Sequence, residues 1–206
     1  MSAKETSTAP ATAVLGLRER KKLKTRQSLR REAYRLFAEQ GYEATSVDQI
    51  AAAAEVSPST FFRYFPTKED VVLSDEYDPM LADVLRSRPA DESIVDSVRY
   101  ALTDPLSRQL ADDREDLLFR TRLTFTVPAL RARSLEDQLS SQTGIAAMIA
   151  ERTGRDPDEL EVKCAAAAII AVATAVVWHW VEGGGEDDLV ALYDHHLGML
   201  SSGLRL

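Results

Sequence analysis

Residues 45–66 read "TSVDQIAAAAEVSPSTFFRYFP" and contain the signals of two short helices joined by a tight turn. Thr45 and Ser46 are both residue types that cap helices, and the apolar residues after them repeat at i, i+3, i+4 and i+7, the spacing of one helix face. Ser57 can cap the second helix, and its first turn accepts Pro58 because the amide hydrogen that proline lacks is not needed there. The proline at the end of the stretch stops this helix after about two turns.

A longer helix is predicted before this stretch, from Arg18 to Gln40, with Gly41 as its C-terminal stop. Its apolar face consists of Leu29, Ala33, Leu36 and Phe37. The chain therefore begins with about three helices, of which the last two are short and joined by a turn. This order is typical of a helix-turn-helix motif, here about 46–65, whose second helix enters the DNA major groove.

Four aromatic residues crowd into the second short helix. Phe61 and Phe65 are four residues apart, so they share a helix face and are predicted to point inward. Phe62, Arg63 and Tyr64 are rotated away from that face, where phosphates would lie. The alternative, that all four aromatic rings belong to the core, is disfavoured because a helix of two turns cannot bury every side.

The net charge of −8 is distributed unevenly. Residues 1–68 carry a net charge of +5, and residues 69–206 carry −13. Five basic residues lie within seven positions at the start of the first helix: Arg18, Arg20, Lys21, Lys22 and Lys24. Because cations oppose the dipole at a helix N-terminus, their clustering favours an anionic partner such as the DNA backbone. A solvated helix end without a role is the alternative.

The stretch 36–72 resembles the DNA-binding domain of the TetR family of bacterial transcriptional regulators. The pattern that carries the resemblance consists of Phe37, Gly41, Tyr42, Thr45, Ile50, Ala51, Val56, Ser57, Phe65 and Lys68. The resemblance implies an all-α homodimer that binds a short palindromic operator in double-stranded DNA. It also implies that the operator is released when a small molecule enters the C-terminal domain.

The same resemblance implies which residues touch DNA. Its phosphate contacts fall on Thr45, Ser46, Phe62, Tyr64 and Lys68. Its base-edge contacts fall on Pro58, Ser59, Thr60 and Arg63. Position 62 is commonly tyrosine in the family, and the phenylalanine found here has no hydroxyl to donate to a phosphate.

After Lys68 the chain is predicted to form about six more helices, which gives about nine in all. The breaks fall at 87–93, 111–116, near Pro128, at 153–159 and at 183–188, with Asp91, Asp156 and Asp187 as expected caps. Short loops predict an antiparallel bundle. The expected domains are a disordered tail at 1–17, a helix-turn-helix domain at 18–67, and a ligand-binding and dimerization domain at 68–206. One helix from Lys68 to about Arg86 is expected to join the two.

Residues 164–180, "CAAAAIIAVATAVVWHW", are apolar almost throughout. We expect no membrane span, because the stretch is shorter than the ~20 apolar residues that a span needs and charges flank it. A helix that is apolar on all sides is instead predicted to face both the bundle core and a second subunit. With the final helix, 187–204, it is the expected homodimer interface. Cys164 is expected to be a small buried apolar residue.

The ligand is the least determined feature. The segment 117–138 and the "WHW" at 178–180 resemble an actinobacterial, mycofactocin-regulator-like subgroup that includes regulators responding to long-chain acyl-CoA. Arginines could bind phosphates beside an apolar slot, so the expected ligand-binding residues are Phe119, Arg120, Leu123 and Trp178. The alternative is that these arginines pair with nearby carboxylates on the surface.

The predicted function is a cytoplasmic, dimeric repressor released from DNA by a small hydrophobic or acyl-type effector. A transcriptional activator, or a regulator without a ligand, is the alternative that the residues leave open. An enzyme that processes acyl groups is a third reading, but we find no catalytic residues, metal site or cofactor motif in the sequence. His179, His195 and His196 do not have the spacing of metal ligands.

Overall fold

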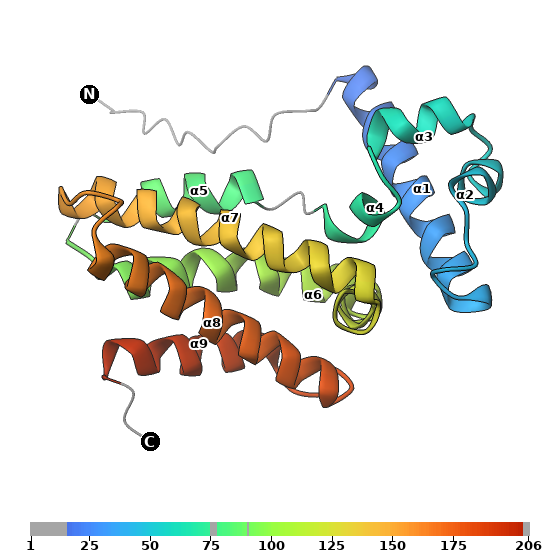
Figure 1. The fold of residues 1–206 in the computed structure, drawn as a ribbon. Helices are drawn as coiled ribbons and strands as arrows, with labels where there is room; N and C mark the ends of the chain where they lie inside the picture. Colours follow the sequence, from blue (N-terminus) through green and yellow to red (C-terminus); the bar gives the residue numbers. More distant parts are fainter. Residues whose placement is uncertain (1–15, 75–77, 90, 204–206) are drawn as a thin grey trace, which may run out of the picture. The chain divides into compact units, whose positions relative to one another are not determined.

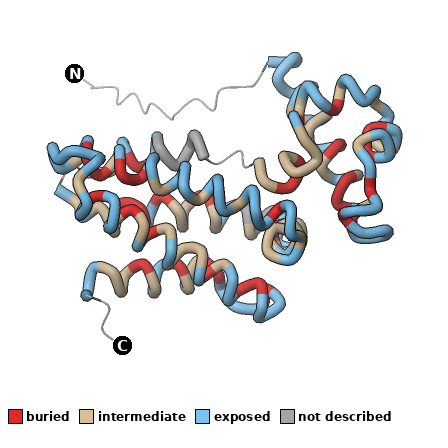
Figure 2. The backbone as a smooth tube through the Cα atoms, viewed as in Figure 1, coloured by how far each residue is buried: buried red, intermediate tan, exposed pale blue. Residues whose placement is uncertain are grey.

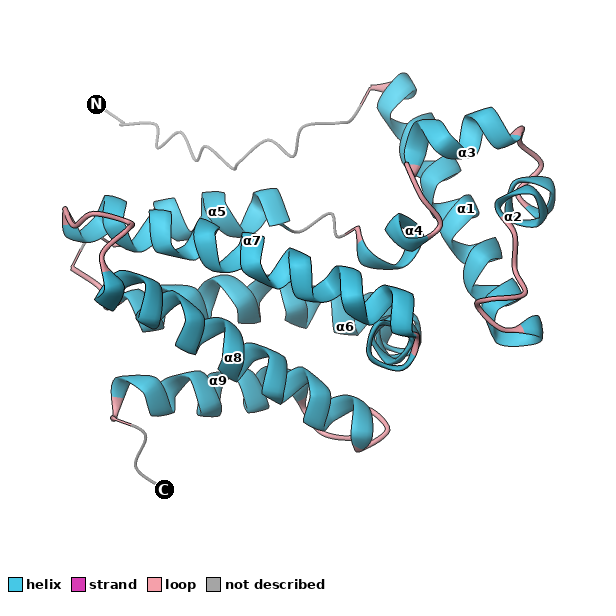
Figure 3. Cartoon of the chain, in the orientation of Figure 1, coloured by secondary structure: helices cyan, strands magenta, loops and turns pink. Residues whose placement is uncertain are grey.

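The structure is a computed structural model that describes residues 16–74, 78–89 and 91–203. The described residues form nine helices. The cartoon in Figure 3 shows these helices and their loops, without a strand among the described residues. The chain divides into two compact units, one ending at Tyr64 and one beginning at Phe65. The boundary expected from the sequence follows residue 67, three residues after the end of the first unit.

The first unit contains α1 (Leu17–Gln40), α2 (Val47–Ala53) and α3 (Pro58–Tyr64). α2 packs against both α1 and α3. The side chains that form its core are fully or almost fully buried: Leu29, Ala33, Phe37, Ile50, Ala51 and Phe61. These are the apolar faces predicted from the spacing of the residues. Of the predicted disordered tail, residues 1–15 lie outside the described residues, and residue 17 is already the first residue of α1.

The turn between α2 and α3 contains a left-handed residue. Glu55 has φ of 56°, and it is the one residue other than glycine with a positive φ in the described part of the chain. The turn is closed by the Val56 amide, which donates to the Ala51 carbonyl at 2.9 Å. Because side chains disfavour this conformation, the turn is kept at a cost of about 1–2 kcal/mol. The hydrogen bonds around it set the direction in which α3 leaves α2.

The prediction of a single helix from Lys68 to about Arg86 is wrong. The chain instead forms a short α4 (Glu69–Leu73), whose C-cap is Ser74 in an extended conformation with ψ of 113°. α5 (Asp78–Ser87) follows it. The start of α4 is held by Thr67 and Asp70, since the Thr67 amide and hydroxyl donate to the Asp70 carboxylate at 2.8 and 2.7 Å.

The remaining helices form the bundle of the second unit: α6 (Ile94–Thr126), α7 (Pro128–Thr153), α8 (Leu160–Glu182) and α9 (Leu189–Ser201). Figure 1 shows them side by side, and α6 packs with α7, α8 and α9. Their buried residues gather where the helices meet (Figure 2). α6 is kinked at Asp113, where φ is −159° and ψ is 59°, within the predicted break at 111–116.

Four of the five predicted breaks separate helices, whereas 111–116 lies inside α6 as the kink. The predicted capping residues are wrong. Ser93 and Asp188 cap α6 and α9 through hydrogen bonds from backbone amides at 3.1 Å, in place of Asp91 and Asp187. The N-cap of α8 is Glu159 and not Asp156. Each predicted cap is a residue of a suitable type in the correct loop, but the N-cap is the residue directly before the first helical turn. The side chains of Ser93 and Asp188 reach amides of that turn, whereas the side chain of Glu159 does not.

α8 corrects two expectations from the sequence. The helix has 23 residues and is long and apolar enough to cross a membrane by length and composition, so the argument that it is too short is wrong. Val162, Ile169 and Trp180 are nevertheless buried in the core of the bundle. Cys164 is exposed and not buried. In a segment that is apolar almost throughout, spacing does not tell which face is turned inward.

Candidate functional site

α3 has one buried face and one exposed face. Phe61 is fully buried, whereas 51% of Phe62 is exposed. Pro58, Ser59 and Arg63 are exposed as well, and Tyr64 is half-buried. The inward position of Phe61 and the outward positions of Phe62 and Arg63 are confirmed. Phe65, also fully buried as predicted, belongs to the second unit.

Hydroxyl groups surround the first turn of α3. The Ser57 hydroxyl accepts a hydrogen bond from the Thr60 amide at 3.2 Å, which makes it the cap that the sequence predicts. It also lies 2.9 Å from the Ser59 hydroxyl and 3.0 Å from that of Thr60. These groups can still donate or accept further hydrogen bonds, as readout of base edges requires. The Arg63 guanidinium lies 5.5 Å from the centre of the Tyr64 ring at the other end of the helix.

Thr45 is not placed to contact phosphate through its side chain. It is 2% exposed, and its hydroxyl donates to the Gly41 carbonyl at 2.8 Å and accepts from the Gln40 amide at 3.0 Å. Thr45 therefore ties the end of α1 to the start of α2. Ser46 is exposed and forms a capping box with Gln49, in which each side chain accepts from the other's backbone amide.

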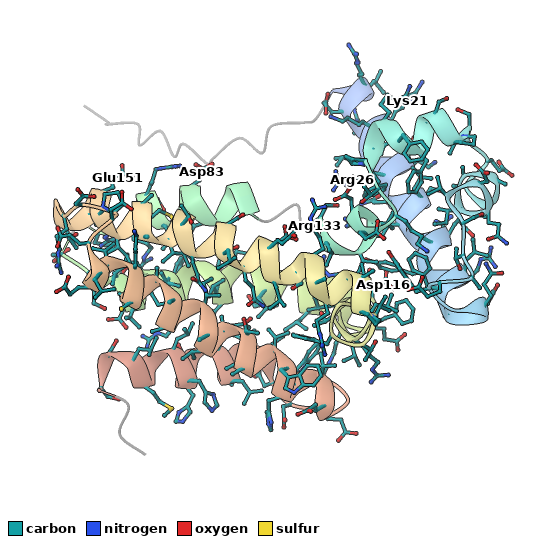
Figure 4. All side chains as sticks on the ribbon, viewed as in Figure 1. Lys21, Arg26, Asp83, Asp116, Arg133 and Glu151 are labelled. Carbon is teal, nitrogen blue, oxygen red and sulfur yellow. The ribbon has the colours of Figure 1, made fainter. Side chains whose placement is uncertain are left out.

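The first turns of α1 carry the cluster of basic residues, hereafter the basic arm: Arg18, Arg20, Lys21, Lys22 and Lys24. All five are exposed, and no residue of α1 before Leu29 is buried. Lys21 and Arg26 are labelled in Figure 4 on this half of the helix. The arm is thus a helical extension with cationic side chains and without a role in the core. Lys68, the remaining predicted phosphate contact, is half-buried at the N-cap of α4 in the second unit.

A cavity of about 310 Å³ lies within the second unit, between α4, α6, α7, α8 and α9. Its apolar lining consists of Val72, Leu73, Phe125, Ile170, Ala173 and Val177. Its polar lining consists of Arg120, Thr121, Thr124, Ser134, Asp137, Gln138, Ser141, Thr174 and Tyr193. Such a cavity lies at the lower end of the range of about 300–1,000 Å³ that small-molecule sites occupy.

Of the four expected ligand-binding residues, only Arg120 lines this cavity. Phe119 and Leu123 lie on other sides of α6. Trp178 is 39% exposed and packs edge-on against Phe125, with ring centres 4.6 Å apart. Trp178 therefore contacts a residue that lines the cavity, Phe125, without lining the cavity itself. Among the arginines near Pro128, Arg133 is a surface ion-pair partner of Asp137 at 3.8 Å, as the alternative interpretation has it.

The sequence contained a signal for the polar side of the cavity that was missed. Ser134, Asp137, Gln138 and Ser141 of α7 repeat at i, i+3, i+4 and i+7, the spacing usually searched for apolar residues. Asp137 and Ser141 are exposed and Ser134 and Gln138 are half-buried, so the cavity is open to solvent on this side. Within the described part of the chain, no group of three or more His, Cys, Asp or Glu residues is arranged to hold a metal ion.

Two family models match the chain. The model described as "Bacterial regulatory proteins, tetR family" matches residues 29–74, which contain the helix-turn-helix. The model described as "MftR C-terminal domain" matches residues 92–205, more than half of the chain. The helix-turn-helix and the bundle therefore both match models of known regulators.

Individual relatives agree with these models. The HTH-type transcriptional regulator TcmR of Streptomyces glaucescens is 36% identical over 80% of this chain and 76% of its own length. The fatty acid degradation regulator FadR of Bacillus halodurans has a similar structure, with a TM-score of 0.60 and 27% identity over 88% of this chain and 96% of that one.

FadR of Bacillus subtilis, solved in complex with stearoyl-CoA, has a TM-score of 0.62 and 24% identity over 87% of this chain and 99% of that one. At this identity it bears on the fold alone. Family models that match both the helix-turn-helix and the bundle, together with the similarity to TcmR, identify the protein as a member of the TetR family of DNA-binding transcriptional regulators.

Proposed function

We propose that the protein is a dimeric repressor that binds a palindromic operator and releases it when a small molecule occupies the bundle cavity. The observation that carries the proposal is the two-faced α3. Phe61 anchors the helix in the core while Ser59, Phe62 and Arg63 remain exposed along the other side. A helix held in this way can present side chains to the major groove without losing its support.

The basic arm supplies the electrostatic part of DNA binding. Its five exposed cations can neutralise backbone phosphates and release counterions, which gives affinity for any sequence. Sequence choice then comes from α3, through Arg63 and the hydroxyl groups of the first turn. Phe62 can contact a phosphate or sugar by its ring edge but cannot donate a hydrogen bond to it. Because bacterial DNA lies in the cytoplasm, the proposed repressor acts there.

A homodimer through α8 and α9 follows from the surface of these helices. An apolar groove of about 260 Å³ runs between them, lined by Val172, Ala175, Val176, His179, Leu192, His196 and Met199. α8 also exposes Ala168 and Ala171, small residues that allow a second helix to approach closely. A two-fold dimer would present α3 twice, at the spacing of about 34–36 Å that successive major grooves require.

The link between cavity and DNA runs through α4. Val72 and Leu73 of this helix line the cavity, and only residues 65–68 separate α4 from α3 in the sequence. An effector that contacts α4 more favourably in one conformation shifts the population toward that conformation. An acyl-CoA is one candidate effector, because residues 117–138 resemble a mycofactocin-regulator-like subgroup that includes regulators responding to long-chain acyl-CoA.

The proposal is tested by selecting operator sequences from a randomised duplex library and measuring binding by fluorescence anisotropy. Arg63→Ala should weaken binding to the selected duplex by about 1–3 kcal/mol and relax selectivity at one position. The matched control is Arg35→Ala, since Arg35 is exposed on α1 but is already paired with Glu32 and Glu39 at 3.0 and 2.8 Å. Equal affinities of the Arg63 variant and the wild type would show that α3 is not the recognition helix.

A further inference from the structure

All three histidines of the chain lie on the two helices of the proposed dimer interface. They are His179, His195 and His196. The first lies in the last turn of α8, and the other two lie on α9, which packs beside α8 (Figure 1). None of the three is buried in the single chain. Histidine is the side chain that ordinarily changes charge between pH 5 and 8, so the response to pH in this range is concentrated on this surface.

The groove between α8 and α9 is apolar apart from two of these histidines. On α8 the lining residues Val172, Ala175, Val176 and His179 repeat at i, i+3, i+4 and i+7. On α9 the lining residues are Leu192, His196 and Met199, at i, i+4 and i+7. Each histidine thus continues an apolar helix face. A second subunit that packs on these two faces also covers both imidazoles, hereafter the groove histidines, His179 and His196.

One nitrogen of His196 is already used by α9. Nδ1 lies 2.8 Å from the carbonyl oxygen of Leu192. Because a carbonyl oxygen only accepts hydrogen bonds, Nδ1 carries the hydrogen, and the neutral ring has its acceptor at Nε2. Nε2 is therefore the atom that takes up a proton when the pH falls. In a dimer that covers the groove, this proton brings a positive charge into apolar surroundings, which costs free energy unless an anion is close.

The charged groups of α9 and of α6, which packs against it, do not supply that anion. Asp194 of α9 is paired with Arg99 of α6 at 3.2 Å. The ring of His195 lies next to that of His196, with ring centres 4.9 Å apart. A proton on each ring would place two like charges side by side, so His195 opposes the protonation of its neighbour.

The charged groups of α8 and of the loop after it bear mainly on the other groove histidine. The Asp187 carboxylate lies 3.7 Å from Nε2 of His179, so it favours a proton there. His196 is therefore the groove histidine that resists protonation more strongly. The remaining acidic residues of this region are exposed and do not line the groove: Glu182, Glu186 and Asp188.

We infer that the proposed dimer is a pH-sensitive assembly that requires neutral groove histidines, so that acidification separates its subunits. The separated subunits bind more protons than the dimer, and a fall in pH therefore favours them. This inference rests on the proposed function and adds a regulatory input to its interface. Net charge alone predicts the opposite effect. Residues 69–206 carry −13, and acidification reduces the repulsion between two such acidic bodies.

The size of the effect follows from the number of histidines covered. A histidine side chain in water takes up its proton near pH 6.5. If the interface admits only the neutral form, each covered histidine raises the dissociation constant of the dimer about tenfold between pH 7.5 and 5.5. The two copies of His196 together contribute about 100-fold. The two copies of His179 contribute less, because Asp187 is close.

The test measures the dissociation constant of the full-length dimer by analytical ultracentrifugation at pH 7.5 and 5.5. For the wild type it should rise by about 100-fold or more on acidification. His196→Leu keeps an apolar side chain in the groove, and its rise should be smaller than that of the wild type by about 100-fold. Glu186→Gln, which removes an exposed carboxylate outside the groove, is the matched control and should keep the wild-type rise. If circular dichroism shows that His196→Leu does not fold, His196→Gln takes its place with the same expected result.

Operator binding gives a second readout. Residues 1–64 contain no histidine, so the helix-turn-helix itself gains no histidine charge on acidification. An added positive charge anywhere on the protein would favour DNA. At protein concentrations near the dissociation constant of the dimer, affinity for the selected duplex should nevertheless fall at pH 5.5. His196→Leu should retain most of that affinity.

A dimer that is as tight at pH 5.5 as at pH 7.5, or tighter, refutes the inference, and so does a His196→Leu variant with the wild-type rise. In both cases a dimer that binds its operator leaves the proposed function standing. A chain that is monomeric at pH 7.5 overturns both. A dimer with the expected pH dependence that selects no duplex overturns the proposed function alone.

Discussion

The basic arm allows a quantitative prediction about DNA binding. The five cations of the basic arm lie between Arg18 and Lys24, seven residues that span about 10 Å at 1.5 Å per residue. Phosphates along one strand are spaced by about 3.4 Å, so this length covers roughly three of them. The arm therefore runs along about three phosphates of one strand.

Replacing Lys21 and Lys24 by glutamine removes two cations that are three residues apart on one helix face. In a dimer four charges are lost, and the slope of log K against log salt should become shallower by about 3.6. Between 50 and 200 mM salt, the affinity of the wild type should therefore fall about 150-fold more than that of the variant. The helix itself should not suffer, because cations at its N-terminus oppose its dipole.

The assay is fluorescence anisotropy on the selected duplex and on a scrambled duplex at several salt concentrations. Both duplexes should lose affinity equally, because the arm contacts phosphates and not bases. A double variant of Arg86 and Arg155, two exposed arginines of the second unit, removes the same charge elsewhere and should keep the wild-type slope. If the arm variant keeps that slope as well, the arm does not contact DNA.

Three further predictions concern stability. Glu55→Gly should raise the free energy of unfolding by about 0.5–1 kcal/mol, measured by urea denaturation, because glycine adopts φ of 56° without strain. Gly185→Ala should lower it by about 1–2 kcal/mol, since φ is 73° and the added carbon would lie 3.0 Å from Leu118. Hydrogen bonds from Arg88 and Ser97 lower the pKa of Glu92 to about 2. A carboxylate whose pKa is depressed on folding stabilises the protein above its unfolded pKa, near 4.5, and that stability is lost as pH falls toward 2. Glu92→Gln should therefore flatten the dependence of melting temperature on pH between about 4.5 and 2.

The Gly185 prediction has a matched control within the chain. Gly184→Ala changes a residue with φ of 69° but with open space around it, so it reports the backbone strain without the clash. An equal loss in the two glycine variants would mean that the contact with Leu118 costs nothing. A Glu55→Gly variant that is less stable than the wild type would contradict the strain argument. For Glu92, an unchanged pH profile in the variant would show that the carboxylate is not linked to stability.

Local signals in the sequence determined where most of the helices and loops of this protein lie. The caps and apolar spacing of α1, α2 and α3 predicted the helix-turn-helix and the outward position of Arg63, because such signals depend on residues within a few positions of one another. The loops of the bundle were predicted from helix-breaking and capping residues for the same reason. The contacts of these residues with DNA remain predictions.

Tertiary structure decided what the local signals leave open. Thr45 is of a residue type that can cap a helix or contact a phosphate. Only the structure shows that its hydroxyl is already hydrogen-bonded to the Gln40 side chain and the Gly41 carbonyl. Residues 164–180 of α8 are apolar almost throughout, so only the neighbouring helices determine that Cys164 is exposed and Trp180 is buried. The cavity is lined by residues of α7 and by Tyr193 of α9, which are far apart in the sequence. They come close together only because the helices of the bundle pack against one another.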